Sequence, residues 1–424
     1  MRNLPLLLSH SSELFSLWYN KELSLRAADK IKRYYFSERR YLGSRDRKFI
    51  ENLYFDMIRN LRLYDWQIKR SIDDIEEIPA EMFTIHAYKR NFSKDDFISE
   101  FKLKDKIAEY FENYDYQNIY PEELEIRWSL PQVVWDHIKD HYSREELETC
   151  LPAMLESPGV HLRTNILKIT TPDLMEKLAN TPFSLGSLSS EALRLDKYSN
   201  LTQNPAFKKG LFDLQDESSQ LVALICNPKK DDIVIDICAG AGGKTLHLAA
   251  LQGDQPTLIA TDKYPNRLKE LVIRAKRLGI RNIKLTPIDK IRSFYKGKAD
   301  ILLIDAPCSG TGVYGRHPDR KWELTEERLS FYINEQSSIL NKNAHLVKEG
   351  GSIVYATCSI IPEENIVQVD QFLESHPEFK LVSVYDDLKE HAIRIPDHND
   401  KYLQILPHHF QSDGFFIAKM KRVK

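Results

Sequence analysis

Two cysteines of this chain stand in short polar turns, and each turn follows an apolar segment. Cys308 belongs to Asp305-Ala-Pro-Cys-Ser-Gly-Thr-Gly312, and Cys358 belongs to Tyr355-Ala-Thr-Cys-Ser359. A thiolate is a strong nucleophile, and an acid in the same turn can hold a substrate or move a proton. A single cysteine after a strand is usually a small buried apolar residue. Two of them beside an acid indicate a catalytic pair instead.

A glycine-rich segment, Asp236-Ile-Cys-Ala-Gly-Ala-Gly-Gly-Lys-Thr245, could bind a nucleotide-containing cofactor. Glycines permit a tight turn between a strand and a helix, and they let backbone amides approach a ligand. The phosphate-binding pattern of nucleotide triphosphatases fails here because Cys238 replaces its first glycine. The dinucleotide pattern also fails, since Thr245 occupies the position of its third glycine.

Acidic residues follow the next two expected strands. Asp262 stands about 20 residues after the glycines, where the ribose hydroxyls of a cofactor would meet a carboxylate. Asp289 follows the third strand, where the edge of a purine ring would lie. Either acid alone could be a solvated loop residue. Their positions at successive strand ends favour binding, because ligands of such sheets lie outside the carboxyl ends of the strands.

Short apolar segments alternate with amphipathic ones from about residue 216 onward, which would place all these turns in one domain. The expected strands are residues 232–236, 257–260, 283–285, 299–304 and 352–356. The expected helices are residues 245–251, 265–278 and 326–347. This alternation predicts an α/β domain with a doubly wound, mostly parallel sheet over residues 216–424.

The rest of the chain predicts two further domains. Residues 1–118 have apolar positions at helical spacing and few Gly or Pro residues, and the segment 43–47 is typical of a turn that begins a helix. Residues 119–215 contain shorter elements separated by prolines, which indicates a small mixed α/β module.

Composition narrows the class of protein. The chain is 42% hydrophobic and 29% charged, as expected for a globular protein, and it has no apolar run of the roughly 20 residues that a membrane span needs. The N-terminus has no secretory signal pattern, so we expect a cytoplasmic protein without a membrane partner. Five cysteines without CxxC spacing argue against both a disulfide framework and a zinc site.

Net charge is only −2, but basic residues gather in two segments, which could bind phosphates or could be solvated faces. These residues are Arg267, Lys269, Arg274, Lys276, Arg277 and Arg281, followed by Arg316, Arg320 and Lys321.

Taken together, these motifs resemble the RsmB/Sun (Fmu) family of RNA cytosine-5 methyltransferases, bacterial rRNA type. The resemblance covers roughly residues 125–424 and includes several further motifs. These are Leu162-Arg-Thr-Asn165, Gln215-Asp-Glu-Ser-Ser-Gln220, Gly315-Arg-His-Pro-Asp319 with Lys321-Trp322, Glu363-Glu-Asn365, Leu406-Pro407 and Asp413-Gly-Phe-Phe-Ile-Ala418. Residues 43–63 are similar to the helical NusB-like domain of the rRNA members.

The resemblance implies a Rossmann-like S-adenosylmethionine methyltransferase domain, preceded by an RRM-like module and an all-α NusB-like domain. It implies Cys358 as the nucleophile, Cys308 as the residue that helps to release the product, and Asp305 as the acid that holds the cytosine. It implies no metal. The implied cofactor residues are Cys238, Ala239, Gly240, Ala241, Gly242, Gly243, Lys244, Asp262, Arg267, Asp289 and Asp305.

A nucleophilic thiol suits this chemistry, since carbon 5 of cytosine reacts poorly with a methyl sulfonium until a thiolate adds at carbon 6. One departure concerns the glycine loop. The family commonly has Cys-Ala-Ala-Pro-Gly-Gly-Lys-Thr, whereas Gly240-Ala241 replace Ala-Pro in this chain. Loss of the proline should loosen the loop slightly.

We therefore predict a monomeric enzyme that forms 5-methylcytosine in small-subunit rRNA. One alternative is the same chemistry on tRNA. Another is a DNA-type enzyme, which would use Cys308 as its nucleophile. A third is a non-catalytic RNA-binding assembly factor, although such a protein would not need both thiols, Asp305 and the cofactor loop together.

Overall fold

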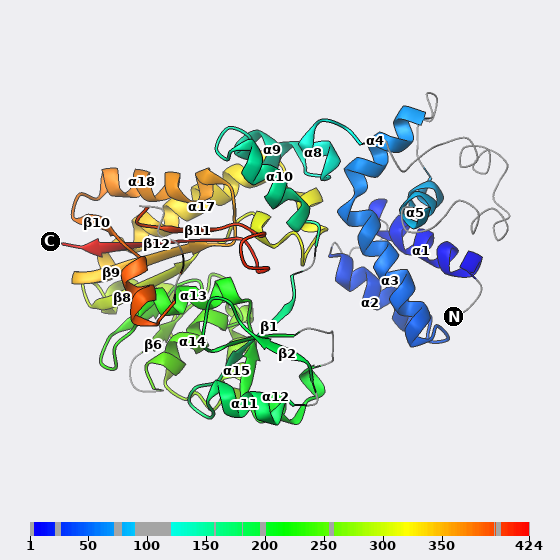
Figure 1. Ribbon diagram of the computed structural model, residues 1–424. Coiled ribbons are helices and arrows are strands. Elements are labelled where there is room, and N and C mark those ends of the chain that lie inside the picture. The colour runs from blue at the N-terminus through cyan, green and yellow to red at the C-terminus, as the bar shows by residue number, and fades with distance from the viewer. Residues whose placement is uncertain are drawn as a thin grey trace. The chain divides into compact units, whose positions relative to one another are not determined.

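The computed structural model describes most of the chain (Figure 1). The described residues are 4–21, 27–71, 79–89, 120–156, 158–179, 181–195, 201–253, 258–393, 395 and 400–423. Its contacts form two compact units. The helical unit comprises residues 1–155 and 316–324, and the sheet unit comprises residues 156–315 and 325–424. The three-domain division predicted from the sequence stays a prediction, and several segments of its first domain, the longest being residues 90–118, lie outside the described part.

The helical unit is built from amphipathic helices around one apolar core. On α3 the apolar positions recur every three or four residues, and Ile50, Tyr54 and Met57 are buried against α1 and α5. Helix α3 begins where the sequence indicated, with Gly43 as N-cap, but without a side-chain cap hydrogen bond. The helices are α1 (Leu4–Tyr19), α2 (Ala28–Glu38), α3 (Ser44–Arg59), α4 (Leu61–Ser71), α5 (Ala80–Lys89), α8 (Leu124–Arg127), α9 (Gln132–Ile138) and α10 (Arg144–Ala153).

The segment Arg316–Leu324, which lies within the region of family resemblance (residues 125–424), belongs to the helical unit. Lys321 donates to the carbonyl oxygens of Arg59 and Ser129, at 2.5 and 2.8 Å. Trp322 donates from Nε1 to the carbonyl of Ile58, at 2.7 Å. Lys321 is only 2% exposed, and burial holds the pKa of its amine well below the usual value. The expectation that Lys321 belongs to a phosphate-binding surface was therefore wrong, because the side chain is enclosed by backbone carbonyls.

The sheet unit contains a mixed eight-stranded sheet with the order β10-β12-β9-β8-β5-β6-β7, and β11 pairs with β12. Strands β5 to β9 are parallel, whereas β12 is antiparallel to β9 and β10 to β12. The strands are β5 (Val234–Asp236), β6 (Leu258–Ala260), β7 (Ile283–Leu285), β8 (Ala299–Asp305), β9 (Val347–Thr357), β10 (Phe379–Val382), β11 (Leu403–Ile405) and β12 (Phe415–Arg422).

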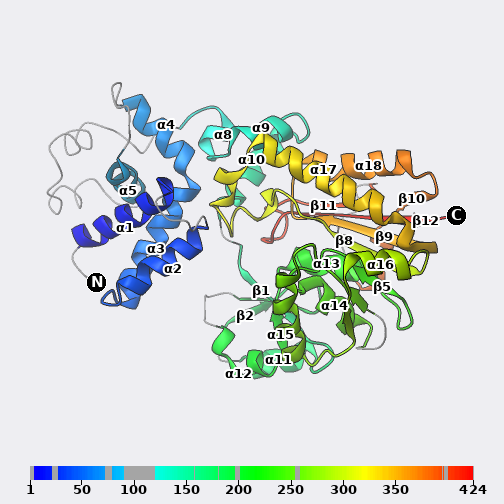
Figure 2. The ribbon, with the colours of Figure 1, turned by 180° about the vertical axis from the view of Figure 1, so that it is seen from behind.

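Side chains alternate along these strands, so each face of the sheet buries its own apolar cluster. Helices α13 (Glu217–Cys226), α14 (Gly243–Leu251), α15 (Leu268–Leu278) and α19 (Tyr385–Glu390) cover one face. Helices α16 (Ile288–Phe294), α17 (Glu326–Asn343) and α18 (Ile366–Ser375) cover the other. Figure 1 shows α13 and α14 on the opposite side of the strands from α17 and α18, and Figure 2 shows the same layers from behind.

The alternation predicted from the sequence therefore gives an α/β sheet with helices on both faces. One helix was predicted too long. Residues 326–347 were expected to be helical, but α17 ends at Asn343 and Val347 already pairs with Ala299 in the sheet. Residues Ala344–Leu346 form a short 3-10 helix, and pairing with the neighbouring strand begins at Val347.

A second, antiparallel sheet precedes the large one in the sequence, with the order β2-β3-β1-β4. Its strands are β1 (Val160–Thr164), β2 (Phe183–Leu185), β3 (Ala192–Leu195) and β4 (Phe212–Leu214), and its helices are α11 (Thr171–Lys177) and α12 (Pro205–Lys208). They share a small apolar core that includes Leu162, Leu174 and Phe212. Its likeness to an RRM and the NusB-like nature of the helical unit stay predictions.

Candidate active site

The carboxyl ends of four parallel strands meet at one edge of the large sheet. Asp236 at the end of β5 lies beside Ala260 of β6 and Leu303 of β8, and Asp305 at the end of β8 pairs with Ala356 of β9. The turns that follow these strands carry Cys238 to Lys244, Asp262, Cys308 and Cys358. The sheet register thus brings most of the predicted site residues to one edge.

The glycine loop after β5 requires glycine at two positions. Gly240 and Gly242 have φ values of +52° and +86°, in the left-handed region that disfavours side chains. A Cβ atom on Gly242 would also lie 2.6 Å from Cγ of Leu271. The loop then enters α14, whose first backbone amides have no partner within the helix and can bind a ligand.

Asp236 fastens the start of this loop, although the sequence analysis gave it no role. It accepts hydrogen bonds from Oγ1 of Thr245 at 2.7 Å and from the amide of Cys238 at 3.2 Å. Burial raises the pKa of Asp236 to about 7. Burial also raises the pKa of the Cys238 thiol well above its usual value, so this third cysteine is held in its neutral form.

Two arginines hold the same loop from behind. Arg163 donates to the carbonyl of Gly243 and Arg274 donates to the carbonyl of Ala241, both at 2.9 Å. One of these hydrogen bonds, from Arg274, restrains Ala241, the position where the family commonly has proline. The loop accepts these bonds through backbone carbonyls, so the residue types of the motif did not indicate them.

Arg274 and a third arginine, Arg277, bind a buried carboxylate, Asp213 of β4. Nη2 of Arg274 and Nη2 of Arg277 lie 2.7 and 2.5 Å from its oxygens. The expectation that Arg274 and Arg277 meet phosphates was wrong for these two side chains, because Asp213 and backbone carbonyls already bind them. Lys276, which stands between them on α15, is exposed.

Lys244 and Asp305 form an ion pair at the centre of the edge, with Nζ 2.7 Å from Oδ2. Burial alone would lower the pKa of Lys244, but the charge and hydrogen bond of Asp305 outweigh it and raise the pKa. The ammonium also lies 4.8 Å from the ring centre of Phe415, a residue to which the sequence gave no role. Asp305 keeps 30% of its side chain exposed, so it can still meet a ligand.

The other predicted cofactor residues differ in how they are placed. Asp262 is half-buried and accepts from the amides of Gly240 and Tyr264, at 3.0 and 2.7 Å. Arg267 is exposed and lies 5.1 Å from the ring centre of Tyr264. Asp289 is exposed in the first turn of α16. Within the described part of the chain, neither Arg267 nor Asp289 bonds to another predicted site residue.

The two thiols predicted as a catalytic pair are in contact. Sγ of Cys308 lies 3.4 Å from Sγ of Cys358, and both side chains are half-buried. The amide of Gly312 donates to the carbonyl of Cys358 at 2.9 Å, which joins the two turns. The hydrogen bond with Cys358, together with burial, raises the pKa of the Cys308 thiol well above its usual value.

A buried glutamate, Glu364, joins both thiol turns and was missed as a functional residue. Its carboxylate accepts from the amide of Ser309 at 2.8 Å and from the hydroxyls of Ser309 and Ser359, both at 2.5 Å. Nε2 of Gln336 donates to it at 3.0 Å. The sequence did show Glu363-Glu-Asn365 as a motif, which was the only signal available.

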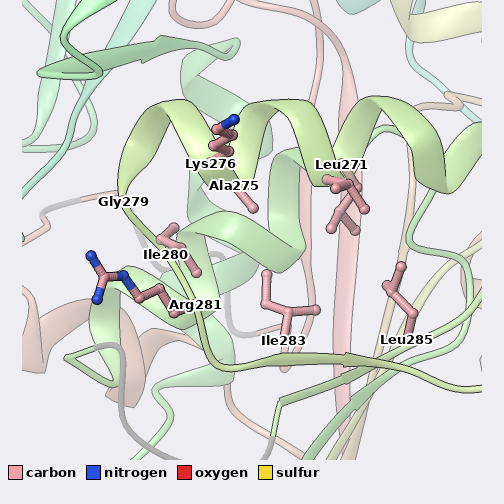
Figure 3. A pocket seen from close by; sticks show the side chains of 9 residues that line it. Leu271, Ala275, Lys276, Gly279, Ile280, Arg281, Ile283 and Leu285 are labelled. Atoms are coloured by element: carbon pink, nitrogen blue, oxygen red, sulfur yellow. The ribbon is translucent and has the colours of Figure 1, made fainter.

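A pocket of about 470 Å³ lies elsewhere in the sheet unit, between α15 and the edge strand β7 (Figure 3). None of the predicted site residues lines it. The lining residues are Leu271, Val272, Ala275, Lys276, Gly279, Ile280, Arg281, Ile283 and Leu285. The residues predicted to carry the chemistry thus lie at the strand ends, outside this pocket.

Known proteins resemble this chain in sequence. A family model described as 16S rRNA methyltransferase RsmB/F matches residues 223–421. The probable ribosomal RNA small subunit methyltransferase B of Synechocystis is 33% identical over 302 residues, which are 70% of this chain and 67% of that protein. The chain belongs to the RsmB/F family of rRNA methyltransferases.

One further relative and one solved structure show how much of the chain is matched. The probable ribosomal RNA small subunit methyltransferase B of Bacillus subtilis is 34% identical, over 69% of this chain and 66% of its own length. The matched region thus spans about two thirds of these relatives. A crystal structure named PH0851 covers 98% of this chain and 99% of its own, with a TM-score of 0.77 and 23% identity, which supports the fold alone.

The described residues contain no helix long and apolar enough to cross a membrane. They also contain no group of three or more His, Cys, Asp or Glu side chains placed to hold a metal ion.

Proposed function

We propose that this protein transfers a methyl group from S-adenosylmethionine to carbon 5 of a cytosine in RNA, with small-subunit rRNA as the substrate. The observation that carries the proposal is the contact between two thiols, 3.4 Å apart, at the sheet edge that also bears the Lys244–Asp305 pair. Membership of the RsmB/F family supports an rRNA substrate. The same chemistry on tRNA is the alternative substrate.

In this proposal the Cys358 thiolate adds to carbon 6 of the cytosine, and the π electrons of the C5–C6 bond make carbon 5 nucleophilic. Asp305 holds the N3 and amino edge of the ring and stabilises the adduct. Bound S-adenosylmethionine supplies an electrophilic methyl group to carbon 5. The carbon-5 proton then leaves to a base from the solvent, and the electron pair of the S–C6 bond returns to Cys358. Cys308, in contact with Cys358, would donate a hydrogen bond to that departing thiolate.

The residues of the glycine loop after β5, together with Asp262, fit S-adenosylmethionine. The half-exposed carboxylate of Asp262 could accept hydrogen bonds from ribose hydroxyls, and the first amides of α14 could meet the negative end of the methionine group. Gly240 to Lys244, with Cys238 and Ala239, would form the wall of the site. Arg267 and Asp289 are exposed, and we propose that they lie at its rim.

Two other parts of the chain are proposed to bind RNA. The four-stranded sheet of residues 160–214 would act as the RRM-like module, and the helical unit would act as the NusB-like domain. RNA recognition commonly relies on unpaired bases and on shape, which catalytic motifs do not encode.

The test separates the two thiols on RNA. With S-adenosylmethionine and small-subunit rRNA, Cys358→Ala should abolish both methyl transfer and any protein–RNA adduct. Cys308→Ala should still add to the base and transfer the methyl group, but should release the product slowly. A denaturing gel should then show an RNA-linked band for Cys308→Ala and none for Cys358→Ala or the double variant.

The alternatives predict other patterns. A DNA-type mechanism, with Cys308 as the nucleophile, would give the band with Cys358→Ala and lose it with Cys308→Ala. A non-catalytic assembly factor would bind RNA but give neither band nor methylated product. Bisulfite-type mapping of rRNA and tRNA from cells that lack the gene would identify the substrate.

A further inference from the structure

The contact between Cys308 and Cys358 has a geometry from which a disulfide bond can form. Their sulfur atoms lie 3.4 Å apart, and a disulfide bond brings two sulfur atoms to about 2.05 Å. Small rotations of the two side chains close a difference of this size. Among the described residues, these are the only two thiols that share a hydrogen bond.

The backbone also places the two cysteines at a suitable separation. Strands β8 and β9 are parallel neighbours, and Asp305 pairs with Ala356 at their ends. Neighbouring strands lie about 4.8 Å apart, and a disulfide joins Cα atoms that are about 4.4–6.8 Å apart. The turns that follow stay joined, because the amide of Gly312 donates to the carbonyl of Cys358 at 2.9 Å. The bond can therefore form without a large movement of the backbone.

Hydrogen bonds beside the two cysteines hold the thiols in contact. The hydroxyls of Ser309 and Ser359, each the next residue after a cysteine, lie 3.3 Å apart. Both donate to the buried carboxylate of Glu364 at 2.5 Å. The hydroxyl of Thr311 lies 3.0 Å from that of Ser359. Two groups held together in this way react with each other far more readily than the same groups on separate molecules.

The pair is also open to a small oxidant. Both of its side chains are half-buried, whereas Cys150 and Cys226 are only 2% exposed. Cys238 is half-buried as well, but within the described chain it shares no hydrogen bond with another thiol. A lone oxidised thiol can pass from sulfenic acid to the irreversible sulfinic and sulfonic acids, whereas a neighbouring thiol traps the sulfenic acid as a disulfide.

We propose that Cys308 and Cys358 form an oxidative modification site, at which a peroxide converts the two thiols into a reversible disulfide. One thiol, as its thiolate, attacks an oxygen atom of hydrogen peroxide, the O–O bond breaks, and the sulfur becomes a sulfenic acid. The second sulfur then attacks the first and displaces its hydroxyl group as water. Two thiols and one hydrogen peroxide thus give one disulfide and two water molecules, and this balance is the same whichever thiol reacts first.

The modification would both block and protect the candidate nucleophile. While the disulfide exists, neither sulfur can add to a base, so methyl transfer should stop. Reduction by a dithiol returns both thiols, because trapping as a disulfide prevents further oxidation. This catalytic consequence rests on the proposed function. The formation of the disulfide does not.

Oxidation of the full-length protein tests the site without RNA. The reduced wild type is treated with hydrogen peroxide, the remaining free thiols are blocked with iodoacetamide, and the peptides are analysed by mass spectrometry. We expect a cross-linked Cys308–Cys358 peptide, two hydrogen atoms lighter than the two separate peptides together, with loss of both free thiols. Dithiothreitol should return both peptides to the free form and restore methyl transfer.

Two variants separate the pair from single thiols. Cys308→Ala removes the thiol that contacts Cys358, so peroxide should carry Cys358 to sulfinic acid, which dithiothreitol does not reverse. Cys150→Ala removes a buried thiol of the helical unit and should form the disulfide as the wild type does. Circular dichroism and thermal unfolding check that both variants are folded.

The proposal would be overturned by two free thiols after peroxide treatment, or by irreversible oxidation of Cys358 that is as fast in the wild type as in Cys308→Ala. Disulfides between separate molecules, seen as a dimer band on a non-reducing gel in place of the internal cross-link, would overturn it too. If the disulfide forms but the reduced protein methylates no rRNA, the proposed function fails and the modification site stands. If the reduced protein methylates rRNA but the disulfide never forms, only the modification site fails.

Discussion

Two buried carboxylates fasten the two halves of the candidate site, and they are satisfied in opposite ways. Glu364 binds neutral donors only, two serines and a glutamine. Asp213 is surrounded by guanidinium groups, with Arg274 and Arg277 at 2.7 and 2.5 Å and Arg163 at 3.9 Å. Each carboxylate thus holds a functional turn from behind, but only one of them keeps an uncompensated charge.

The difference appears in their protonation. Burial would raise the pKa of Asp213, but Arg274, Arg163 and Arg277 outweigh it and lower the pKa below its usual value. Burial raises the pKa of Glu364, and its neutral hydrogen bonds do not reverse this. A carboxylate neutralised by arginine serves as scaffold, because its field is cancelled locally. A carboxylate held by neutral donors can still act on the titration of its neighbours.

The largest expected effect is the loss of stability on removing Asp213. Asp213→Ala leaves three guanidinium groups without their carboxylate, and removing one partner of a buried pair costs about 3–5 kcal/mol of unfolding free energy. Urea unfolding measures this loss. Asp386→Ala, which removes a carboxylate that is 79% exposed, should cost less than about 1 kcal/mol. A loss at Asp213 no greater than that at Asp386 would show that the arginines find other partners.

Sequence reasoning found the residues at strand ends but not the carboxylates that fasten them. Strands and their carboxyl ends follow from apolar alternation, so Asp262, Asp305 and Cys308 could be placed at one edge from local pattern alone. Glu364 could not be interpreted in this way, because it acts on Ser309, which is 55 residues away in the sequence. The sequence alone does not distinguish a buried acid from a solvated one, because its partners come from distant parts of the chain.

The same limit explains the errors on basic residues. Arg274 and Arg277 stand on an amphipathic helix among other cations, and helical spacing gives no sign that Asp213 of another element binds two of them. Lys321 was grouped with surface cations, but backbone carbonyls enclose it. Charge clusters in a sequence predict a surface only where no tertiary partner exists.

The next effect concerns the half of the site that Asp213 supports. Asp262→Ala should weaken S-adenosylmethionine binding at least tenfold, because charge-assisted hydrogen bonds contribute about 1.5–3 kcal/mol each. Isothermal calorimetry measures the affinity. Asp289→Ala is the matched control in the first turn of α16, where the carboxylate is exposed, and it should weaken binding less. Wild-type affinity in Asp262→Ala would remove this residue from the cofactor site.

A smaller effect should distinguish the two carboxylates by pH. The pKa of Glu364 is raised in the folded state, so its contribution to stability is lost as the pH rises through that value, above its ordinary 4.5. The pKa of Asp213 is lowered, so its contribution is lost as the pH falls below its ordinary 3.8. Each slope is at most about 1.4 kcal/mol per pH unit.

Urea unfolding of the wild type, Glu364→Gln and Asp213→Asn from pH 3 to about 7 should therefore show opposite trends. The stability advantage of the wild type over Glu364→Gln should shrink with rising pH. Its advantage over Asp213→Asn should shrink with falling pH. Parallel trends would mean that the two carboxylates do not differ in the way proposed.

The smallest effect concerns the cation that Asp213 does not bind. Of the three basic residues at positions 274, 276 and 277, two turn to Asp213, and Lys276 remains exposed on α15. If this face meets RNA, Lys276→Glu should lower the slope of log affinity against log salt by about one, since each phosphate contact releases about one counterion. Affinities measured between 50 and about 200 mM salt give the slope.

Lys380→Glu, on the exposed part of the opposite edge strand β10, makes the same charge change and should leave the slope as it is. Equal slopes for the wild type and both variants would assign Lys276 to a solvated face, and the basic character of α15 would then serve only to bind Asp213 and the glycine loop.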